Sequence, residues 1–246
     1  MLKTTADARN HLLASLPENE YAQLQPYLKD MPLKQGVVLA EQGEPIEHVY
    51  FPHSGMVSIV VVLQEGEKSV ETATVGREGA VGAIAGLGER KATARAIVQV
   101  AGNGSRIPAR HLHTVVRQSP FLRDFLIRYQ EMLLHQAQQS TACNALHEAR
   151  PRLCRWLLQT RDRLDSDMVA LTQEFLAQML GVRRTTVTEL ARGLQSKGLV
   201  RYKRGKIEIL DRPALEECAC ECYDALRHQA EHYFPRCTSV SPPSAT

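Results

Sequence analysis

The 246-residue sequence predicts an α+β protein: an antiparallel β-domain, one long helix, and a C-terminal domain dominated by helices. Short segments rich in β-branched residues, separated by Gly and Pro, fill residues 36–100 and are typical of a β-sandwich or barrel. Between Pro120 and Pro151 there is neither Pro nor Gly, which favours an uninterrupted helix. Beyond Pro151, apolar residues recur at helical spacing until two short β-segments begin near residue 198.

The composition is that of an ordinary globular protein, with 43% hydrophobic and 23% charged residues. No apolar run approaches the length of a membrane-spanning helix, and the N-terminus lacks the basic and apolar regions of a secretory signal. Six cysteines are too few for a disulfide scaffold. We therefore expect a cytoplasmic protein with reduced thiols and no membrane contact.

The N-terminal part is predicted to begin with helices and to continue as strands. Apolar residues at three- and four-residue steps indicate helix over residues 7–28, which Pro17 divides into two short pieces. The expected strands are Gly36–Ala40, His48–Phe51, Met56–Leu63, Ser69–Val75 and Thr93–Val100. Helical spacing returns after Pro108.

The uninterrupted stretch after Pro120 carries a stripe of residues at alternating steps of four and three, which is the spacing of a coiled-coil seam. The predicted dimerisation contacts, in the apolar half of this stripe, are Leu122, Leu126, Tyr129 and Leu133. The length of the helix favours this dimer seam. The alternative is an amphipathic helix that lies on its own β-domain, against which Phe125 and Met132 could also pack.

Residues 172–197 have the pattern of a helix-turn-helix. Thr172 can cap a helix that starts at the next residue. Counted from that residue, a small side chain stands at position five and Gly181 at position nine, where the turn needs a positive φ. Val187 and Leu190, at positions fifteen and eighteen, are apolar and can hold the second helix against the first.

Positive charge is concentrated in and after the second helix. Residues 181–206 contain eight Lys and Arg and one acidic residue, so they carry +7, whereas the other 220 residues sum to −4. Two short strands, 198–202 and 206–210, surround Lys203-Arg204-Gly205 and make a basic hairpin, or wing. This density of positive charge is typical of a surface that binds the phosphates of double-stranded DNA.

The second helix is expected to lie in the major groove, with its N-terminal residues nearest the bases. Arg184 is the best candidate for a bidentate contact to guanine. Glu189 either accepts from a cytosine or pairs with Arg192 or Arg183. The predicted DNA-contacting residues, to bases or phosphates, are Thr172, Gln173, Arg183, Arg184, Thr185, Thr186, Thr188, Glu189, Arg192, Lys197, Lys203, Arg204 and Lys206.

Residues 171–187 (LTQEFLAQMLGVRRTTV) and 194–200 (LQSKGLV) resemble the C-terminal motif of the Crp/Fnr family of bacterial transcription regulators. The N-terminal half is similar to the family in Glu41–Pro45, Val49–Phe51 and Ser54–Val57, and the resemblance covers residues 10–230. It implies a homodimer that reads a palindromic operator, is gated by an unknown signal and contacts RNA polymerase.

The same resemblance implies the domain organisation. The expected parts are an N-terminal β-roll (a double-stranded β-helix) of the cyclic nucleotide-binding type over residues 1–116, a dimerisation helix over 117–147, a winged helix-turn-helix domain over 148–235, and a disordered tail over 236–246.

Family members that bind cyclic AMP place a Gly-Glu pair and an Arg around its phosphate. Here Ala83 stands in place of the Glu and Ala92 in place of the Arg, with Lys91 and Arg95 as possible substitutes. A phosphate buried without a cation is costly, so we expect no cyclic AMP binding and leave the effector open. An N-terminal iron–sulfur cluster is not expected, because the first cysteine is Cys143.

The recognition helix also departs from the family, whose members often carry Glu followed by Arg four residues later. This chain has Thr185 and Glu189 at those places and retains Arg184. The operator sequence therefore does not follow from the resemblance.

Two groups of potential metal ligands are candidates for a zinc site or a metal-dependent enzyme. To bind zinc, Cys218, Cys220 and Cys222 would need a further ligand pair, for which His228 and His232 lie downstream. We interpret the three cysteines as small half-buried thiols in a C-terminal helix. His111-x-His113 resembles the ligand pair of metal-dependent cupins, but no Glu follows at cupin spacing. We therefore predict no metal site, no cofactor and no catalytic residue. The rival hypothesis is a ligand-binding or cupin-like enzyme with a helical oligomerisation tail.

Overall fold

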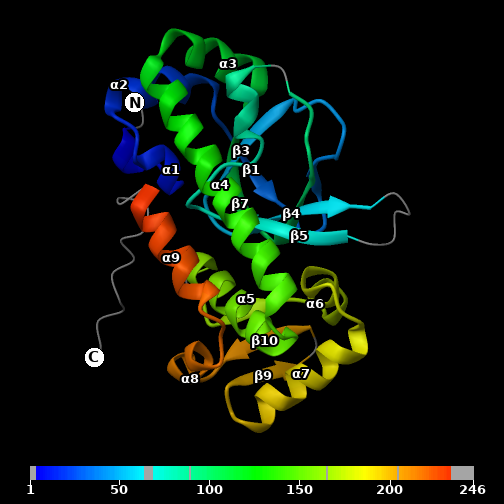
Figure 1. Cartoon of the computed structure of the whole chain (residues 1–246). Helices are drawn as coiled ribbons and strands as arrows, with labels where there is room; N and C mark the ends of the chain where they lie inside the picture. Colours follow the sequence, from blue (N-terminus) through cyan, green and yellow to red (C-terminus); the bar gives the residue numbers. More distant parts are fainter. Residues whose placement is uncertain (1–3, 64–68, 89, 165, 204, 234–246) are drawn as a thin grey trace.

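In the computed structural model, a β-domain and a C-terminal domain are joined along one side by a long helix (Figure 1). The structure describes residues 4–63, 69–88, 90–164, 166–203 and 205–233. Arg204 of the predicted wing and the predicted tail 236–246 lie outside these ranges. None of the helices within them is long and apolar enough to cross a membrane.

The β-domain consists of two antiparallel sheets, with strand orders β1-β7-β3 and β2-β6-β4-β5. The strands are β1 (Lys29–Leu33), β2 (Val38–Ala40), β3 (His48–Pro52), β4 (Met56–Val62), β5 (Ser69–Val75), β6 (Arg95–Val100) and β7 (Gly102–Pro108). Leu33 and Tyr50 of the first sheet meet Val57, Val75 and Val98 of the second in one buried cluster. Both sheets therefore bury one face in a shared core, and the predicted β-roll is confirmed.

All five predicted strands are present as β2 to β6, whereas β1 and β7 were not predicted. Strand β1 contains Pro32, which an edge strand tolerates. Strand β7 begins with Gly102 and also contains Gly104. A Cβ added at Gly102 would lie 2.2 Å from the Ser54 carbonyl oxygen, so only glycine fits where the two backbones approach closely. The same glycine is untypical of a strand, which is why β7 was not predicted from the sequence.

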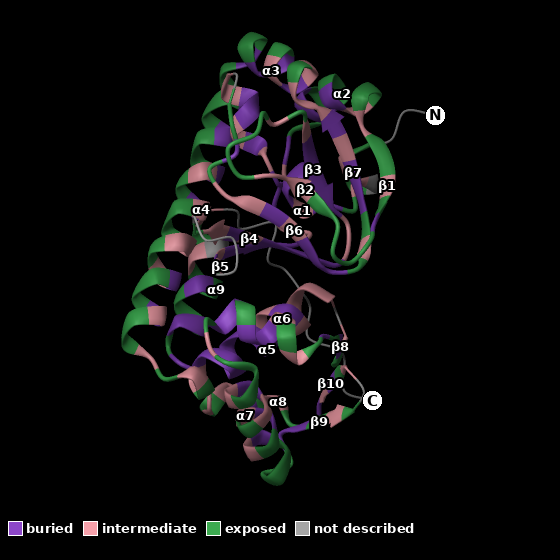
Figure 2. Ribbon diagram, turned by 90° about the vertical axis from the view of Figure 1, so that its right-hand side faces the viewer, coloured by how far each residue is buried: buried purple, intermediate pink, exposed green. Residues whose placement is uncertain are grey.

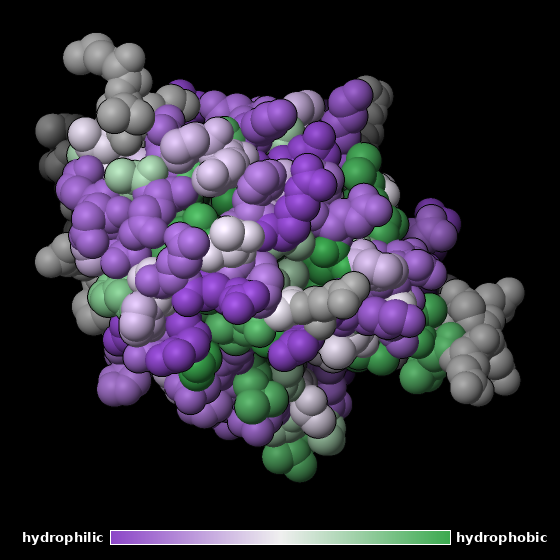
Figure 3. All heavy atoms as spheres, turned by 90° about the horizontal axis from the view of Figure 1, so that it is seen from above, coloured by the Kyte–Doolittle hydropathy of each residue, from purple (hydrophilic) through white to green (hydrophobic). Residues whose placement is uncertain are grey.

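Short helices cover the β-domain. They are η1 (Thr5–Asp7), α1 (His11–Ala14), α2 (Glu18–Leu24), η2 (Gln25–Tyr27), η3 (Ala83–Leu87) and α3 (Ala109–Gln118). Buried Asn10 caps α1 and donates from Nδ2 to the carbonyls of Pro52 and Gly79, both at 2.8 Å, which fixes the N-terminal helices on the roll. The end of the molecule seen in Figure 3 is mainly hydrophilic, with small groups of hydrophobic residues.

Helix α4 (Pro120–Leu146) is the long helix that the absence of Pro and Gly predicted. Ser119 caps it by accepting a hydrogen bond from the Leu122 N–H at 3.1 Å, and Pro120 occupies the first turn. The helix runs along the β-domain and reaches the C-terminal domain (Figure 2).

The predicted dimerisation contacts on α4 face the chain's own β-domain instead. Leu122, Leu126 and Tyr129 are at most 4% exposed within a single chain, and Leu133 is half-buried. Tyr129 Oη donates to the Ala80 carbonyl at 2.9 Å and accepts from the Ala80 N–H at 2.7 Å. Burial within one chain contradicts a dimer-seam role for Leu122, Leu126 and Tyr129, whereas for half-buried Leu133 that role stays a prediction. Their spacing shows only that one side of the helix is buried, and the surface that buries it is the roll.

The C-terminal domain contains a helix-turn-helix and a three-stranded sheet with order β8-β10-β9. Its elements are α5 (Ala149–Leu164), β8 (Met168–Ala170), α6 (Gln173–Leu180), α7 (Arg184–Ser196), β9 (Val200–Lys203), β10 (Lys206–Ile209), α8 (Arg212–Glu217) and α9 (Cys222–Tyr233). Trp156 and Leu157 of α5 lie in the buried core of this domain. Helix α9 turns back and packs against α4 (Figure 1).

The two domains share a buried interface. Met56 and Val60 of β4 belong to the same apolar cluster as α5. Glu71 of β5 is buried there, where it accepts hydrogen bonds from Trp156 Nε1 at 2.9 Å and from Ser58 Oγ at 2.5 Å. Removal of this carboxyl from water raises the pKa of Glu71 to about 7, although both hydrogen bonds favour the ionised form.

Candidate DNA-binding surface

The helix-turn-helix is built as the sequence predicted. Thr172 Oγ1 accepts from the Phe175 N–H at 3.3 Å and caps α6. Gly181 ends α6 with φ of +62°, and the following N–H, from Val182, donates to the Ala177 carbonyl at 3.0 Å. Ala177 is 9% exposed at this junction, where a small residue lets α6 and α7 approach closely.

Apolar residues on the inner side of α7 hold it against α6. Val187 is fully buried, and half-buried Leu190 packs against the same cluster, which includes Leu176 of α6. The opposite side of α7 is exposed to solvent, so the packing of this helix determines which of its side chains remain available to a ligand.

The wing follows directly. Strands β9 and β10 are antiparallel, and Lys203 lies opposite Lys206 across the tight turn that contains Gly205. The Gly205 carbonyl accepts from the Leu171 N–H at 2.8 Å. This bond fixes the base of the wing to the segment that enters α6, so the wing and the helix-turn-helix form one surface.

Six exposed cations gather on this surface. They are Arg183, Arg184, Arg192, Lys197, Lys203 and Lys206. Within the described part of the chain, none of the six forms an ion pair with a carboxylate. Glu189, the acidic residue on the same helix, is exposed and pairs with none of them. The predicted intramolecular partnership of Glu189 with Arg183 or Arg192 is therefore not present.

The polar side chains predicted to contact DNA differ in their exposure and in their hydrogen bonds within the chain. Thr185 is exposed and Thr186 is half-buried. Thr188 Oγ1 lies 3.0 Å from Gln173 Oε1 and 3.1 Å from the Arg184 carbonyl, so its hydroxyl connects α7 to α6. Gln173 and Thr188 thus have a positioning role that sequence reasoning did not assign to them.

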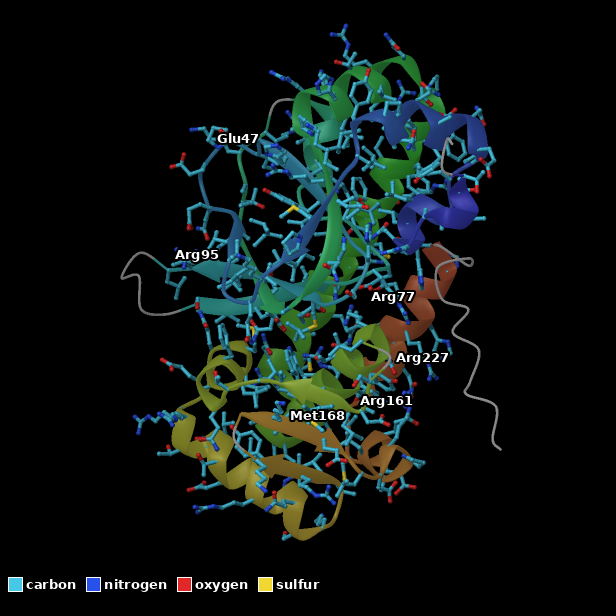
Figure 4. All side chains as sticks on the ribbon, turned by 180° about the vertical axis from the view of Figure 1, so that it is seen from behind. Glu47, Arg77, Arg95, Arg161, Met168 and Arg227 are labelled. Atoms are coloured by element: carbon cyan, nitrogen blue, oxygen red, sulfur yellow. The ribbon has the colours of Figure 1, made fainter. Side chains whose placement is uncertain are left out.

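The segment that would bind a cyclic nucleotide phosphate is apolar at the two decisive positions. Gly82, with φ of +77°, starts η3, and the next residue, Ala83, is 1% exposed. Ala92 is also buried. Arg95, on the outer edge of the roll in Figure 4, is engaged by Glu41, with 2.9 Å between Nε and Oε1. That ion pair lowers the pKa of Glu41, chiefly through the hydrogen bond from Arg95.

The other residues singled out from the sequence are separated by the fold. His111 stacks on Tyr27 with ring centroids 4.5 Å apart, while His113 Nδ1 lies 3.2 Å from the Gly86 carbonyl. Each imidazole thus has its own partner, and the cupin-like alternative is not favoured. Cys220 and Cys222 are buried beside Cys143, a neighbour that the sequence did not suggest, whereas Cys218 lies outside that cluster.

Two family models match the chain. Residues 30–119 match the cyclic nucleotide-binding domain, and residues 151–218 match the Crp-like helix-turn-helix domain. A comparison with curated proteins gives no significant match.

Solved structures share the fold over most of the chain. A putative transcriptional regulator of the Crp/Fnr family from Eubacterium rectale is 18% identical, with a TM-score of 0.63 over 84% of this chain and 96% of that chain. A CRP-family transcriptional regulator from Thermus thermophilus is 20% identical, with a TM-score of 0.63 over 77% of this chain and 96% of that chain. The c-di-GMP responsive global regulator CLP of Xanthomonas campestris is 14% identical, with a TM-score of 0.64 over 79% of this chain and 100% of that chain. With a cyclic nucleotide-binding type roll followed by a Crp-like helix-turn-helix, this chain belongs to the Crp/Fnr family of transcription regulators.

Proposed function

We propose that this protein binds specific DNA sequences as a homodimer, regulates transcription there, and is controlled by a signal received at the β-roll. The observation that carries DNA binding is the set of six exposed cations on α7 and the wing that have no carboxylate partner within the described residues. Such cations can replace the counterions of DNA phosphates without first breaking an ion pair. The resemblance to the Crp/Fnr family further implies RNA polymerase as a partner.

Within this proposal, α7 lies in the major groove and the wing lies over the adjacent backbone. Arg184 is in the first turn of α7, where its planar guanidinium can reach O6 and N7 of a guanine. Lys203 and Lys206 are exposed on the wing, where they hold phosphates and so fix the register of the protein on the DNA without reading its sequence.

The homodimer is proposed to form through the side of α4 that faces away from the roll. Ile127 and Leu134, one heptad apart, are 41% and 56% exposed, and Thr141 and Ala145 continue this side as exposed small residues. Two such faces pack around a two-fold axis, which requires an inverted repeat with half-sites about one helical turn apart.

The route for the signal is proposed to be the contact between β5 and the C-terminal domain. Gln178 of α6 donates to Ser69 of β5, and Trp156 of α5 donates to Glu71 of the same strand. A shift of β5 within the roll would therefore move α6, on which the recognition helix rests.

The DNA-binding proposal is tested by selecting bound sequences from a random pool and measuring affinity by fluorescence anisotropy at several salt concentrations. Lys203→Ala should weaken binding to all sequences alike and lower the slope of log K against log salt by about one. Lys29→Ala, an exposed lysine on β1 of the other domain, should leave the slope unchanged. Failure to select any bound sequence would contradict the proposal, as would an unchanged slope for Lys203→Ala.

A further inference from the structure

Four side chains that commonly bind metals converge where α4 meets the C-terminal domain. Cys143 lies in the last turn of α4, and His147 follows that helix directly. Cys220 lies between α8 and α9, and Cys222 is the first residue of α9. The three sulfur atoms and one imidazole nitrogen all lie within 4.8 Å of one another.

Two of the distances among these four atoms match those between ligands of a single ion. Sγ of Cys143 and Sγ of Cys220 are 3.5 Å apart, and Sγ of Cys222 is 3.6 Å from Nδ1 of His147. Zinc–sulfur bonds of about 2.3 Å and zinc–nitrogen bonds of about 2.1 Å place tetrahedral ligands about 3.5–3.8 Å apart. A cluster of several irons needs ligands that are spread more widely.

The surrounding groups orient the ligands. His147 Nε2 lies 3.1 Å from Glu221 Oε1, which leaves Nδ1 turned toward the cysteines. A carboxylate on the far nitrogen fixes the tautomer of a metal-bound histidine and makes it a stronger ligand. Gln139 Nε2 donates to Cys222 Sγ at 3.0 Å, so the sulfur also has a donor from outside the group.

The three cysteines are buried together rather than dispersed in the apolar core. Cys143 is 0%, Cys220 6% and Cys222 1% exposed, and the three form a cluster of their own. Thiols that serve only as small apolar side chains have no need of an aligned imidazole and carboxylate beside them. The juxtaposition therefore favours a ligand set over simple packing.

We propose that Cys143, His147, Cys220 and Cys222 form a structural zinc site that binds one Zn²⁺ through three thiolates and His147 Nδ1. Binding releases the three thiol protons to solvent. Because protein ligands fill all four positions, no open position remains for a substrate, which is the arrangement of structural rather than catalytic zinc. The ion connects the end of α4 to the start of α9 and so ties the C-terminal helices to the long helix.

The test uses the full chain, purified under reducing conditions without chelator. Atomic emission should find about one zinc ion per chain. Protein stripped of metal and titrated with cobalt chloride should show the visible bands of tetrahedral Co²⁺ and sulfur-to-metal charge transfer. Cys220→Ser should lose the zinc, whereas Cys218→Ser should keep it, because Cys218 is two residues away but outside the cluster.

A second variant separates loss of metal from loss of folding. His147→Cys supplies a fourth thiolate, so it should retain zinc and strengthen the charge-transfer band of the cobalt form. The proposal is overturned if the wild-type protein holds no zinc as purified and binds none when zinc chloride is added. It is also overturned by an octahedral cobalt spectrum, by a Cys143–Cys220 disulfide under the same reducing conditions, or by loss of zinc from Cys218→Ser.

Discussion

Ionisation of Glu71 should weaken the interface between the β-roll and the C-terminal domain. The carboxyl is 8% exposed and lies between β4, β5 and α5, where burial raises its pKa from 4.5 to about 7. Below pH 4.5, the group is protonated in both the folded and the unfolded protein. As pH rises from there to about 7, the unfolded protein releases the proton first, so the free energy of unfolding falls. The pKa difference corresponds to about 3 kcal/mol, lost in full above pH 7.

Glu71→Gln removes this dependence because its amide does not ionise, while its Oε1 can still accept from Trp156 Nε1. The variant and the wild type should unfold with similar free energies at pH 4.5. At pH 8 the variant should be more stable by about 3 kcal/mol. Urea unfolding followed by tryptophan emission measures this directly, since Trp156 is the only tryptophan in the chain and contacts the substituted group.

The control is Glu174→Gln, an exposed carboxyl on α6, whose stability profile should follow that of the wild type across the same pH range. The reasoning about Glu71 is refuted if Glu71→Gln differs from the wild type by the same free energy at every pH. A constant difference would mean that the pKa of Glu71 is the same in the folded and the unfolded protein.

Three further outcomes are expected. Arg184→Ala should cost roughly 1–3 kcal/mol and relax the preference at one position per half-site in anisotropy with single-base variants; equal weakening on random DNA would make Arg184 a phosphate contact. Ile127→Glu combined with Leu134→Glu should give monomers in sedimentation and weak DNA binding, whereas Arg128→Glu, exposed on the edge of the same helix, should remain dimeric; a dimeric double variant would exclude that face. Calorimetry with cyclic AMP at physiological concentration should show no binding because buried Ala92 supplies no cation; micromolar affinity would contradict this.

The helix-turn-helix could be predicted closely because its determinants are local. The cap at Thr172, the left-handed Gly181 and the apolar Val187 all act on residues within a few turns. Each of these residues has one dominant physical role that is independent of the rest of the chain. The predicted helix and turn therefore coincide with α6, Gly181 and α7.

The surface against which the long helix packs could not be predicted in the same way. The spacing of Leu122, Leu126 and Tyr129 predicts which side of α4 is buried. It does not predict whether that side packs against the same chain or against a partner chain. The deciding contact is the pair of hydrogen bonds between Tyr129 and the backbone of Ala80. That contact spans 49 residues and depends on the closure of the roll.

The cysteines illustrate the same limit more strongly. In the sequence, Cys218, Cys220 and Cys222 look like one group, because they are spaced by two. The fold divides them, since Cys218 packs against the core of the C-terminal domain while the other two face Cys143, at a separation of 77 residues for the Cys143–Cys220 contact. The signal available in the sequence was the i, i+4 pair of Cys143 and His147 at the end of an otherwise uninterrupted helix.

These contacts assign three different tasks to one helix. The buried side of α4 holds the β-roll through Tyr129, and its C-terminal end carries two of the proposed zinc ligands. The side that carries Ile127 and Leu134 is left exposed, so a partner chain can be added without disturbing either contact. Because the roll and the C-terminal helices are fixed to the same helix, we expect the proposed signal in the roll to act through β5 and its contacts with α5 and α6 rather than through α4. On this reasoning, changes in the roll would alter the position of the recognition helix through the contact of Glu71 on β5 with Trp156 on α5, rather than through the long helix.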